Sequence, residues 1–177
     1  MKFFILYIIV VLFAPLAVKA EGARYSYQGI VGTYSDPVAE YNTIPMTIDL
    51  NSYVIKTFDV IEFGKNCILN SLSFCINSPS LKFSMPKKKL EVGEKWSLFF
   101  DDSEILFEVR NRIRLHLIGI DEVVYVIDSM NISENSKVEQ RFYFSETKGL
   151  LMFSSFGAPD ILYWSSNQVG IAIDTEE

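Results

Sequence analysis

The sequence has one histidine, His116, and two cysteines, Cys67 and Cys75, so it is poor in the side chains that most often carry acid–base and metal chemistry. A lone histidine has no second group titrating near neutrality with which to exchange a proton. The sequence also lacks Cys-x-x-Cys spacing, a glycine-rich phosphate loop and a Gly-x-Ser-x-Gly nucleophile motif. It therefore predicts no catalytic residues, no metal ligands and no cofactor, and a hydrolase is the least supported alternative.

Helical periodicity is absent after the first twenty residues. Residues 1–20 combine Lys2, an apolar run and small residues before Ala20, which is the pattern of a secretory signal peptide. The apolar run is interrupted by Pro15 and is shorter than the roughly 20 residues of a membrane-spanning helix. We expect cleavage after Ala20, which leaves residues 21–177 as a single β-rich domain, not membrane-spanning, in the periplasm or secreted.

The chain has fewer basic than acidic residues, with 16 Lys and Arg, 22 Asp and Glu, and a formal net charge of −6. Removal of Lys2 and Lys19 with the signal peptide makes the chain more acidic still. Nucleic-acid binding needs a basic surface that displaces counterions from phosphates. We therefore expect no nucleic-acid partner.

Residues 138–156 predict two antiparallel strands joined by a short turn. Apolar and polar side chains alternate over residues 138–145, as in a strand with one buried face. Polar residues follow, and Gly149 closes them, which favours a turn whose last residue has positive φ. Residues 150–156 then return as the second strand.

Further β-rich runs, separated by turn residues, fill the rest of the chain. They cover residues 25–31, 44–50, 53–63, 81–85, 96–100, 105–109, 113–119, 123–127, 161–164 and 169–173. The apolar run over residues 123–127 indicates burial on both faces. Short strands with turns at near-regular spacing are typical of an all-β protein. The predicted fold is a single-domain antiparallel β-sandwich or open β-barrel.

The two cysteines, Cys67 and Cys75, predict a disulfide in an oxidising compartment. A straight strand would separate their Cα atoms by about 26 Å, whereas a disulfide requires about 4.4–6.8 Å. The chain must therefore reverse between them, near Asn70 and Ser71. A redox pair is the alternative, but the spacing differs from the two-residue gap of thiol oxidoreductases.

Cationic side chains alternate along one predicted strand: Arg110, Arg112, Arg114 and His116. In a regular strand they share one face, unless a turn at Asn111 breaks the register. Such a stripe could bind an anionic ligand or partner through bidentate guanidinium contacts. Alternatively, these cations pair across strands with acidic residues on an exposed face, namely Glu108, Glu122 and Glu139.

Aromatic residues make up 14% of the chain, so their rings either fill the core or line an apolar cavity. With catalysis disfavoured, we expect a non-enzymatic binding or accessory protein that holds an apolar or amphiphilic, lipid-like ligand on a concave aromatic face. The alternative is a protein-interaction module, such as a periplasmic inhibitor or assembly subunit, that binds through an edge strand or the cationic stripe.

Two motifs resemble those of uncharacterised exported bacterial proteins of unknown function. One is Leu90-Glu91-Val92-Gly93-Glu94-Lys95-Trp96, an entry strand of the form Val-Gly-x-x-Trp. The other is a late hairpin of the form aromatic-x-aromatic-Ser-x-x-x-Gly-Leu, here Phe142 to Ser145 and then Gly149-Leu150. The resemblance covers roughly the second half of the chain. It implies a bacterial envelope protein and brings no catalytic residues with it.

Export can be tested on the protein purified from its own host. The intact mass should correspond to a chain that begins at Glu21 and carries two hydrogens fewer than the reduced form. Reduction and alkylation should then label both cysteines. A mass that includes residues 1–20 would contradict the signal-peptide interpretation.

Overall fold

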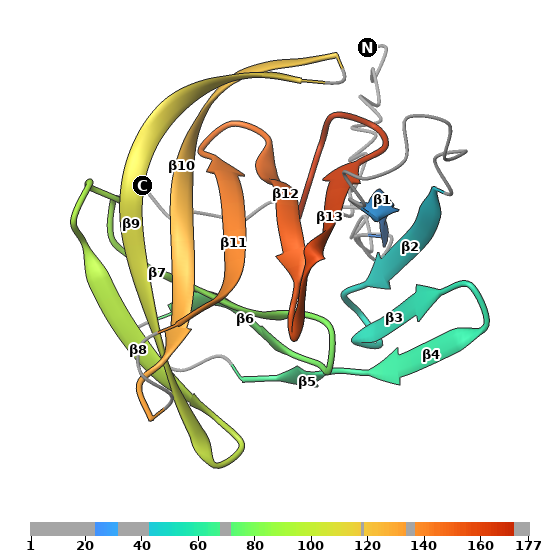
Figure 1. Cartoon of the computed structure of the whole chain (residues 1–177), viewed down its shortest axis with the longest axis horizontal. Helices are drawn as coiled ribbons and strands as arrows, with labels where there is room; N and C mark the ends of the chain where they lie inside the picture. Colours follow the sequence, from blue (N-terminus) through green and yellow to red (C-terminus); the bar gives the residue numbers. More distant parts are fainter. Residues whose placement is uncertain (1–23, 32–42, 68–71, 118, 134–136, 172–177) are drawn as a thin grey trace, which may run out of the picture.

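The computed structural model describes residues 24–31, 43–67, 72–117, 119–133 and 137–171, and all regular structure in these ranges is β (Figure 1). A large antiparallel sheet has the strand order β4-β3-β2-β1-β13-β12-β11-β10-β9-β8. Its strands are β1 (Arg24–Val31), β2 (Ile44–Asp49), β3 (Val54–Thr57), β4 (Val60–Phe63), β8 (Lys95–Phe100), β9 (Ser103–Leu117), β10 (Ile120–Asn131), β11 (Val138–Ser145), β12 (Gly149–Ser155) and β13 (Ala158–Ser165).

A small sheet in the order β5-β6-β7 consists of β5 (Lys65–Asn66), β6 (Leu72–Asn77) and β7 (Lys82–Pro86). The predicted all-β, antiparallel class is confirmed. Among the described strands the large sheet keeps two open edges, β4 and β8. The described residues hold no helix long and apolar enough to cross a membrane.

The large sheet curves around β6 and β7, which run across its strands (Figure 1). Side chains of the enclosed, inner face pack with those of the small sheet in the main core. On β9, for example, Ile105, Phe107 and Val109 alternate inward and are fully buried. The alternating apolar residues of the large sheet thus form one side of the core, and side chains of β6 and β7 form the other.

Gln140 joins the small sheet to the large one. This fully buried side chain accepts a hydrogen bond from the Lys82 amide at 2.9 Å and donates to the carbonyl oxygens of Ser80 at 3.1 Å and Ser154 at 2.7 Å. Three backbone groups that would otherwise be buried without partners are satisfied by one amide. The contact fixes the start of β7 against β11 and β12.

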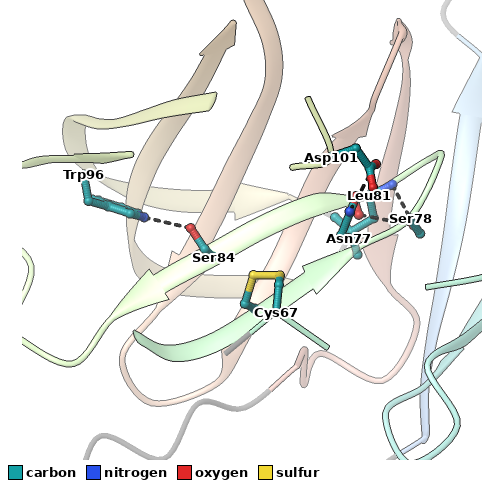
Figure 2. The surroundings of a disulfide bond; sticks show 8 residues. Cys67, Asn77, Ser78, Leu81, Ser84, Trp96 and Asp101 are labelled. Carbon is teal, nitrogen blue, oxygen red and sulfur yellow. Dashed lines mark hydrogen bonds between the residues drawn. A yellow bond between two sulfur atoms is a disulfide. The ribbon is translucent and has the colours of Figure 1, made fainter. Parts of the chain in front are cut away.

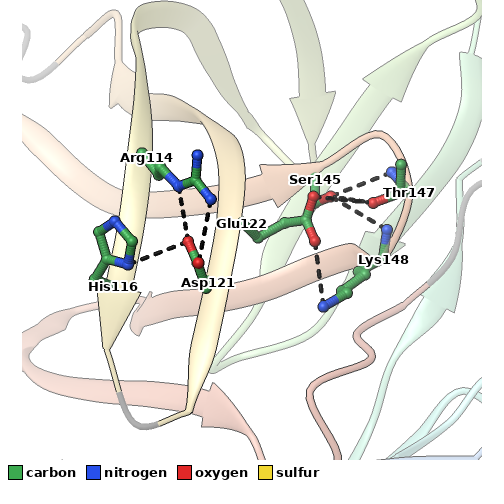
Figure 3. Close-up of polar contacts among 7 residues, drawn as sticks. All are labelled: Arg114, His116, Asp121, Glu122, Ser145, Thr147 and Lys148. Atoms are coloured by element: carbon green, nitrogen blue, oxygen red, sulfur yellow. Dashed lines mark hydrogen bonds and ion pairs between the residues drawn. The ribbon is translucent and has the colours of Figure 1, made fainter.

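The predicted hairpin over residues 138–156 is confirmed as β11 and β12. Gly149 closes the turn with φ of 77°, as its place in the sequence predicted. The Ser145 hydroxyl accepts hydrogen bonds from the Thr147 and Lys148 amides and so holds the turn (Figure 3). Ser145 therefore stabilises this turn through hydrogen bonds between its side chain and the backbone of the turn.

A second apolar cluster lies on the opposite, outer face of the large sheet: Ile120, Val124, Leu151, Met152 and Trp164. The end of the β9–β10 hairpin covers it, since Ile113 and Leu115 pack against this cluster. Figure 1 shows the hairpin arching over the ends of β11, β12 and β13. At its tip Gly119 has φ of 75°, and a Cβ there would lie 2.9 Å from the Gln168 side chain, so the tip reaches the loop after β13.

Several element predictions need correction. The run over residues 53–63 is two strands, because a tight turn at Phe58 and Asp59 reverses it. The runs over residues 105–109 and 113–119 belong to one strand, β9. In the run over residues 123–127, Val123 is exposed while the next four residues are buried, and residues 169–173 contribute one bridge, between Ile171 and Leu150, with residues 172 and 173 outside the described ranges.

The disulfide between Cys67 and Cys75 is confirmed, with Cα atoms 5.2 Å apart (Figure 2). The reversal that it requires is present because β5 pairs antiparallel with β6, although Asn70 and Ser71 lie outside the described residues. Cys75 belongs to β6, a strand that was not predicted, because its residues follow the cysteine loop without a turn signal. Close by, the Trp96 indole donates to the Ser84 hydroxyl and ties β8 to β7 (Figure 2).

Replacing the bridging amide should destabilise the fold. Gln140→Leu leaves three buried backbone groups without partners, and we expect the free energy of unfolding to fall by about 2–4 kcal/mol. Urea denaturation followed by tryptophan fluorescence measures this change. The exposed Gln28 on β1 provides the control, and Gln28→Leu should change stability by less than about 0.5 kcal/mol. Equal stability of both variants would contradict the bridging role.

Candidate functional site

The cationic stripe is divided by a β-bulge. Val126 pairs with Asn111 and Ile127 pairs with Val109, so Arg110 is an extra residue in β9. An extra residue reverses the side to which the following side chains point. The prediction of one shared face is therefore wrong for Arg110, and the break at Asn111 is a bulge within a continuous strand, not a turn.

Arg110 joins a charged network on the outer face. Its guanidinium lies 2.8 Å from Glu108 and 3.7 Å from Asp128. Asp128 is buried and also accepts two hydrogen bonds from Arg141, at 2.7 and 3.0 Å. Bidentate geometry of this kind compensates a buried carboxylate. The pair of Arg110 and Glu108 lies within β9, so it is not the pairing across strands that the sequence predicted; the contact of Arg110 that crosses strands is with Asp128 of β10.

Arg114 and His116 both contact the carboxylate of Asp121, on the face of the β9–β10 hairpin opposite Arg110 (Figure 3). Two Arg114 nitrogens donate to the carboxylate at 2.8 and 3.1 Å, and His116 Nδ1 lies 3.1 Å from it. The hydrogen bond from Arg114 is the largest cause of a lowered pKa of Asp121. All three side chains are more than half exposed, so this pairing is screened by solvent.

The other two acids expected to pair with the stripe, Glu122 and Glu139, form no ion pair with it among the described residues. Glu122 contacts the β11–β12 turn, where it accepts from the Thr147 hydroxyl and pairs with Lys148 at 3.2 Å (Figure 3). No ion pair of Glu139 with a stripe cation occurs among the described residues. Asp121 is the acid that contacts Arg114 and His116 instead.

Arg112 is the stripe member without a carboxylate partner in the described part of the chain. Its guanidinium carbon lies 5.4 Å from the centre of the Tyr125 ring, in a cation–π contact. Burial is the largest cause of a raised pKa of the Tyr125 hydroxyl, which donates to Glu146 at 3.2 Å. The stripe therefore leaves one guanidinium available for an anionic group, not three.

The concave aromatic face is occupied by the protein itself. Phe83 of β7 packs against Phe142 with ring centres 4.6 Å apart, and it also contacts Phe107. Trp96 stacks on Phe107 at 5.4 Å, and Tyr27 lies edge-on to Phe153. These inner-face rings are in contact with each other and with the small sheet, so they fill the core, which is one of the two roles predicted for the aromatic residues.

An exposed apolar surface lies at the opposite end of the large sheet, on the β3–β4 hairpin. We call it the hairpin patch, and its residues are Phe58, Val60, Ile61 and Phe63, with exposed fractions of 65%, 59%, 52% and 75%. β4 is the last described strand at this edge of the sheet. The sequence could not reveal the patch, because a run of apolar and β-branched residues predicts a buried strand as readily as an exposed one.

The other edge strand, β8, is protected differently. Its exposed side chains include Lys95, which pairs with Glu108 at 3.5 Å, and Ser97, which donates to Glu104 at 2.7 Å. Charged and hydrogen-bonded residues are the usual means of keeping an edge strand from pairing with other chains. Phe99 is the one large apolar side chain exposed on β8. The two edges thus differ in chemistry: β4 exposes three large apolar side chains, whereas β8 exposes one.

The backbone of Phe58 has a conformation that is unfavourable for a residue with a bulky side chain. Its φ is 48°, in the left-handed region that bulky residues rarely adopt. The ring is 65% exposed, so burial offsets little of this cost. Strained and exposed aromatic residues are uncommon, and they concentrate at sites of binding or catalysis. The position therefore marks the hairpin patch as a candidate binding site.

The described residues include no cluster of His, Cys, Asp and Glu that could hold a metal ion. Of the sequence-predicted site residues, the structure brings Cys67 and Cys75 together in the disulfide and places three stripe members on one side of the β9–β10 hairpin. Neither group lies on the β3–β4 hairpin.

Relief of the strain at Phe58 should stabilise the fold. We expect Phe58→Gly to raise the free energy of unfolding by up to about 1 kcal/mol, because glycine adopts positive φ without steric cost. Phe58→Ala removes the ring but keeps the Cβ atom, so it should leave stability nearly unchanged. Chemical denaturation of both variants measures the difference. A glycine variant less stable than the alanine variant would show that Phe58 is not strained.

The comparisons with known proteins give no family assignment: a scan against family models, a search of curated proteins and a search of solved structures each found no match to this chain.

Proposed function

We propose that the protein is an exported, non-enzymatic binding or accessory protein of the bacterial envelope, and that it binds a polypeptide partner on the hairpin patch. The observation that carries the proposal is the chemistry of β4, which is an edge strand among the described residues and has exposed apolar side chains. Open apolar edges promote pairing with other chains, and natural proteins usually avoid them. Where one persists, a binding partner is the simplest explanation.

Export is supported by two features. Residues 1–20 have the pattern of a signal peptide, and Cys67 and Cys75 form a disulfide, which persists in oxidising compartments such as the periplasm or the extracellular space. The resemblance to exported bacterial proteins supports the envelope as the location. A periplasmic or secreted protein meets partners whose chains are extended after translocation, which are suited to edge-strand binding.

A lipid-like ligand on the inner face is the second candidate, and the aromatic content of the chain motivates it. Core packing makes this candidate weaker than the hairpin patch, because Phe83, Phe107 and Phe142 already fill the space between the two sheets. Binding there would require β6 and β7 to move away from the large sheet. The hairpin patch requires no such movement.

The proposal is tested by site-specific photo-crosslinking in the native host. A benzophenone amino acid replaces Phe63 in one variant and Phe99 in another, since both are exposed aromatics on edge strands with exposed fractions of 75% and 67%. We expect one discrete polypeptide adduct at position 63, identified by mass spectrometry, and none at position 99. Because both sites are exposed, neither change should alter stability by more than about 0.5 kcal/mol.

A second variant makes the result specific to the patch. Ile61→Lys in the position 63 background should abolish the adduct, because a charge replaces an apolar contact of the same patch. Equal adducts at positions 63 and 99 would contradict the proposal. Adducts with lipid alone would also contradict it, in favour of the amphiphilic ligand.

A further inference from the structure

The hydrogen-bonding pattern of the β3–β4 hairpin shows which backbone groups of β4 face the open edge. The Gly64 amide donates to the Tyr53 carbonyl at 2.7 Å, so Gly64 and Tyr53 are a hydrogen-bonded pair next to the paired ends of β3 and β4. In an antiparallel ladder, bonded and non-bonded pairs alternate. Glu62 and Val60 therefore direct their backbone groups to β3, and Ile61 and Phe63 direct theirs to the edge.

Ile61 and Phe63 also present their side chains on one face. They lie opposite Lys56 and Val54 of β3, whereas Glu62 lies opposite the fully buried Ile55. Side chains alternate along a strand, so Ile61 and Phe63 share the outer face of the sheet. The two residues with outward backbone groups thus carry two of the three exposed apolar side chains of β4, and the third, Val60, lies on the face of Glu62.

Glu62 is fixed on the opposite face. One oxygen of its carboxylate, Oε2, accepts hydrogen bonds from the Ser80 amide at 3.0 Å and the Ser80 hydroxyl at 2.7 Å. Among the described residues it forms no ion pair with a cation. A partly buried carboxylate at the edge strand, held in place and without a cation, favours a positive group beside it.

From these three observations we infer that β4 binds an extended polypeptide segment of alternating apolar, basic and apolar residues as an added strand of the large sheet. This inference rests on the proposed function and names the partner of the same site. Main-chain groups of the segment pair with Ile61 and Phe63, its apolar side chains extend the outer surface, and its Lys or Arg lies beside Glu62. Neighbouring side chains on adjacent strands share a face, which fixes the alternation.

A second copy of the chain fits this edge less well. Two-fold pairing centred on Glu62 would place Ile61 beside Phe63 of the other copy, but the two Glu62 carboxylates would then face each other. Like charges directly opposite are destabilising. Pairing centred on Ile61 would place Phe63 opposite Asp59 and Glu62 opposite Val60, so charged and apolar side chains would meet. The edge is therefore complementary to a basic segment and not to itself.

Synthetic peptides test the inference on the mature protein. One probe is the acetylated and amidated peptide Ser-Thr-Val-Lys-Val-Thr-Ser, and its control has Glu in place of Lys. We expect the lysine peptide to bind about fivefold more tightly than the control, the upper value for an exposed ion pair. Amide hydrogen exchange measured by NMR should slow at Ile61 and Phe63 and remain unchanged at Glu62.

Two variants separate backbone pairing from side-chain contact. Ile61→Pro keeps an apolar residue but removes the outward amide, a change that edge strands tolerate, and it should abolish peptide binding. Glu62→Gln should remove the preference for lysine and retain the binding. Circular dichroism of both variants establishes that the fold is intact.

The outcomes also separate the inference from the proposed function. If the peptides cause no slowing of exchange at Ile61 and Phe63 while the position 63 adduct persists, partner binding stands and strand addition is wrong. Absence of both overturns both. Equal affinity for the two peptides overturns the basic character of the partner, and a stable dimer of the mature protein overturns the heterologous segment in favour of a second copy.

Discussion

The structure depends on the aromatic contact between β7 and the inner face of the large sheet. Phe83 contacts Phe107 of β9 and Phe142 of β11, and it has no exposed surface. A ten-stranded sheet has an inner face too large to remain in water, and the hydrophobic effect requires a second layer to cover it. The small sheet is that layer, and the Gln140 bridge and the disulfide hold it in position. Because the aromatic rings fill the core, the binding that we propose lies at the β4 edge of the sheet and not on the inner face.

The β-bulge at Arg110 determines how the long hairpin is used. Before the bulge, odd-numbered residues of β9 enter the main core, and after it Ile113 and Leu115 cover the outer cluster. One extra residue thus lets a single strand contribute to two apolar clusters on opposite faces of the sheet. The same change directs Arg112, Arg114 and His116 to the solvent-exposed side of the hairpin, where Asp121 and Tyr125 contact them.

The sequence predicted the features that depend on local patterns. The alternation of apolar and polar residues predicted β11, and the position of Gly149 predicted the turn after it. Both features depend on residues that are close together in the sequence. Exposure of the hairpin patch was not predictable, since Ile61 has the same side chain whether it faces a core or solvent. The bulge at Arg110 was equally hidden, as it arises from pairing between β9 and β10 and has no required residue type. The disulfide was predictable because geometry and compartment limit two cysteines to few arrangements.

The order of strands in the large sheet has a consequence for folding. Strands β8 to β13 follow one another along the chain and pair with their sequence neighbours, so they form through short loops. Strands β1 to β4 attach to this unit through β13, the last described strand in the chain. Pairing of β1 must therefore wait until the chain has emerged almost completely, and loop closure over this separation is slow. For the export that we propose, this topology means that the first strands find their partner only when nearly the whole chain is available, which is compatible with transport in an unfolded state.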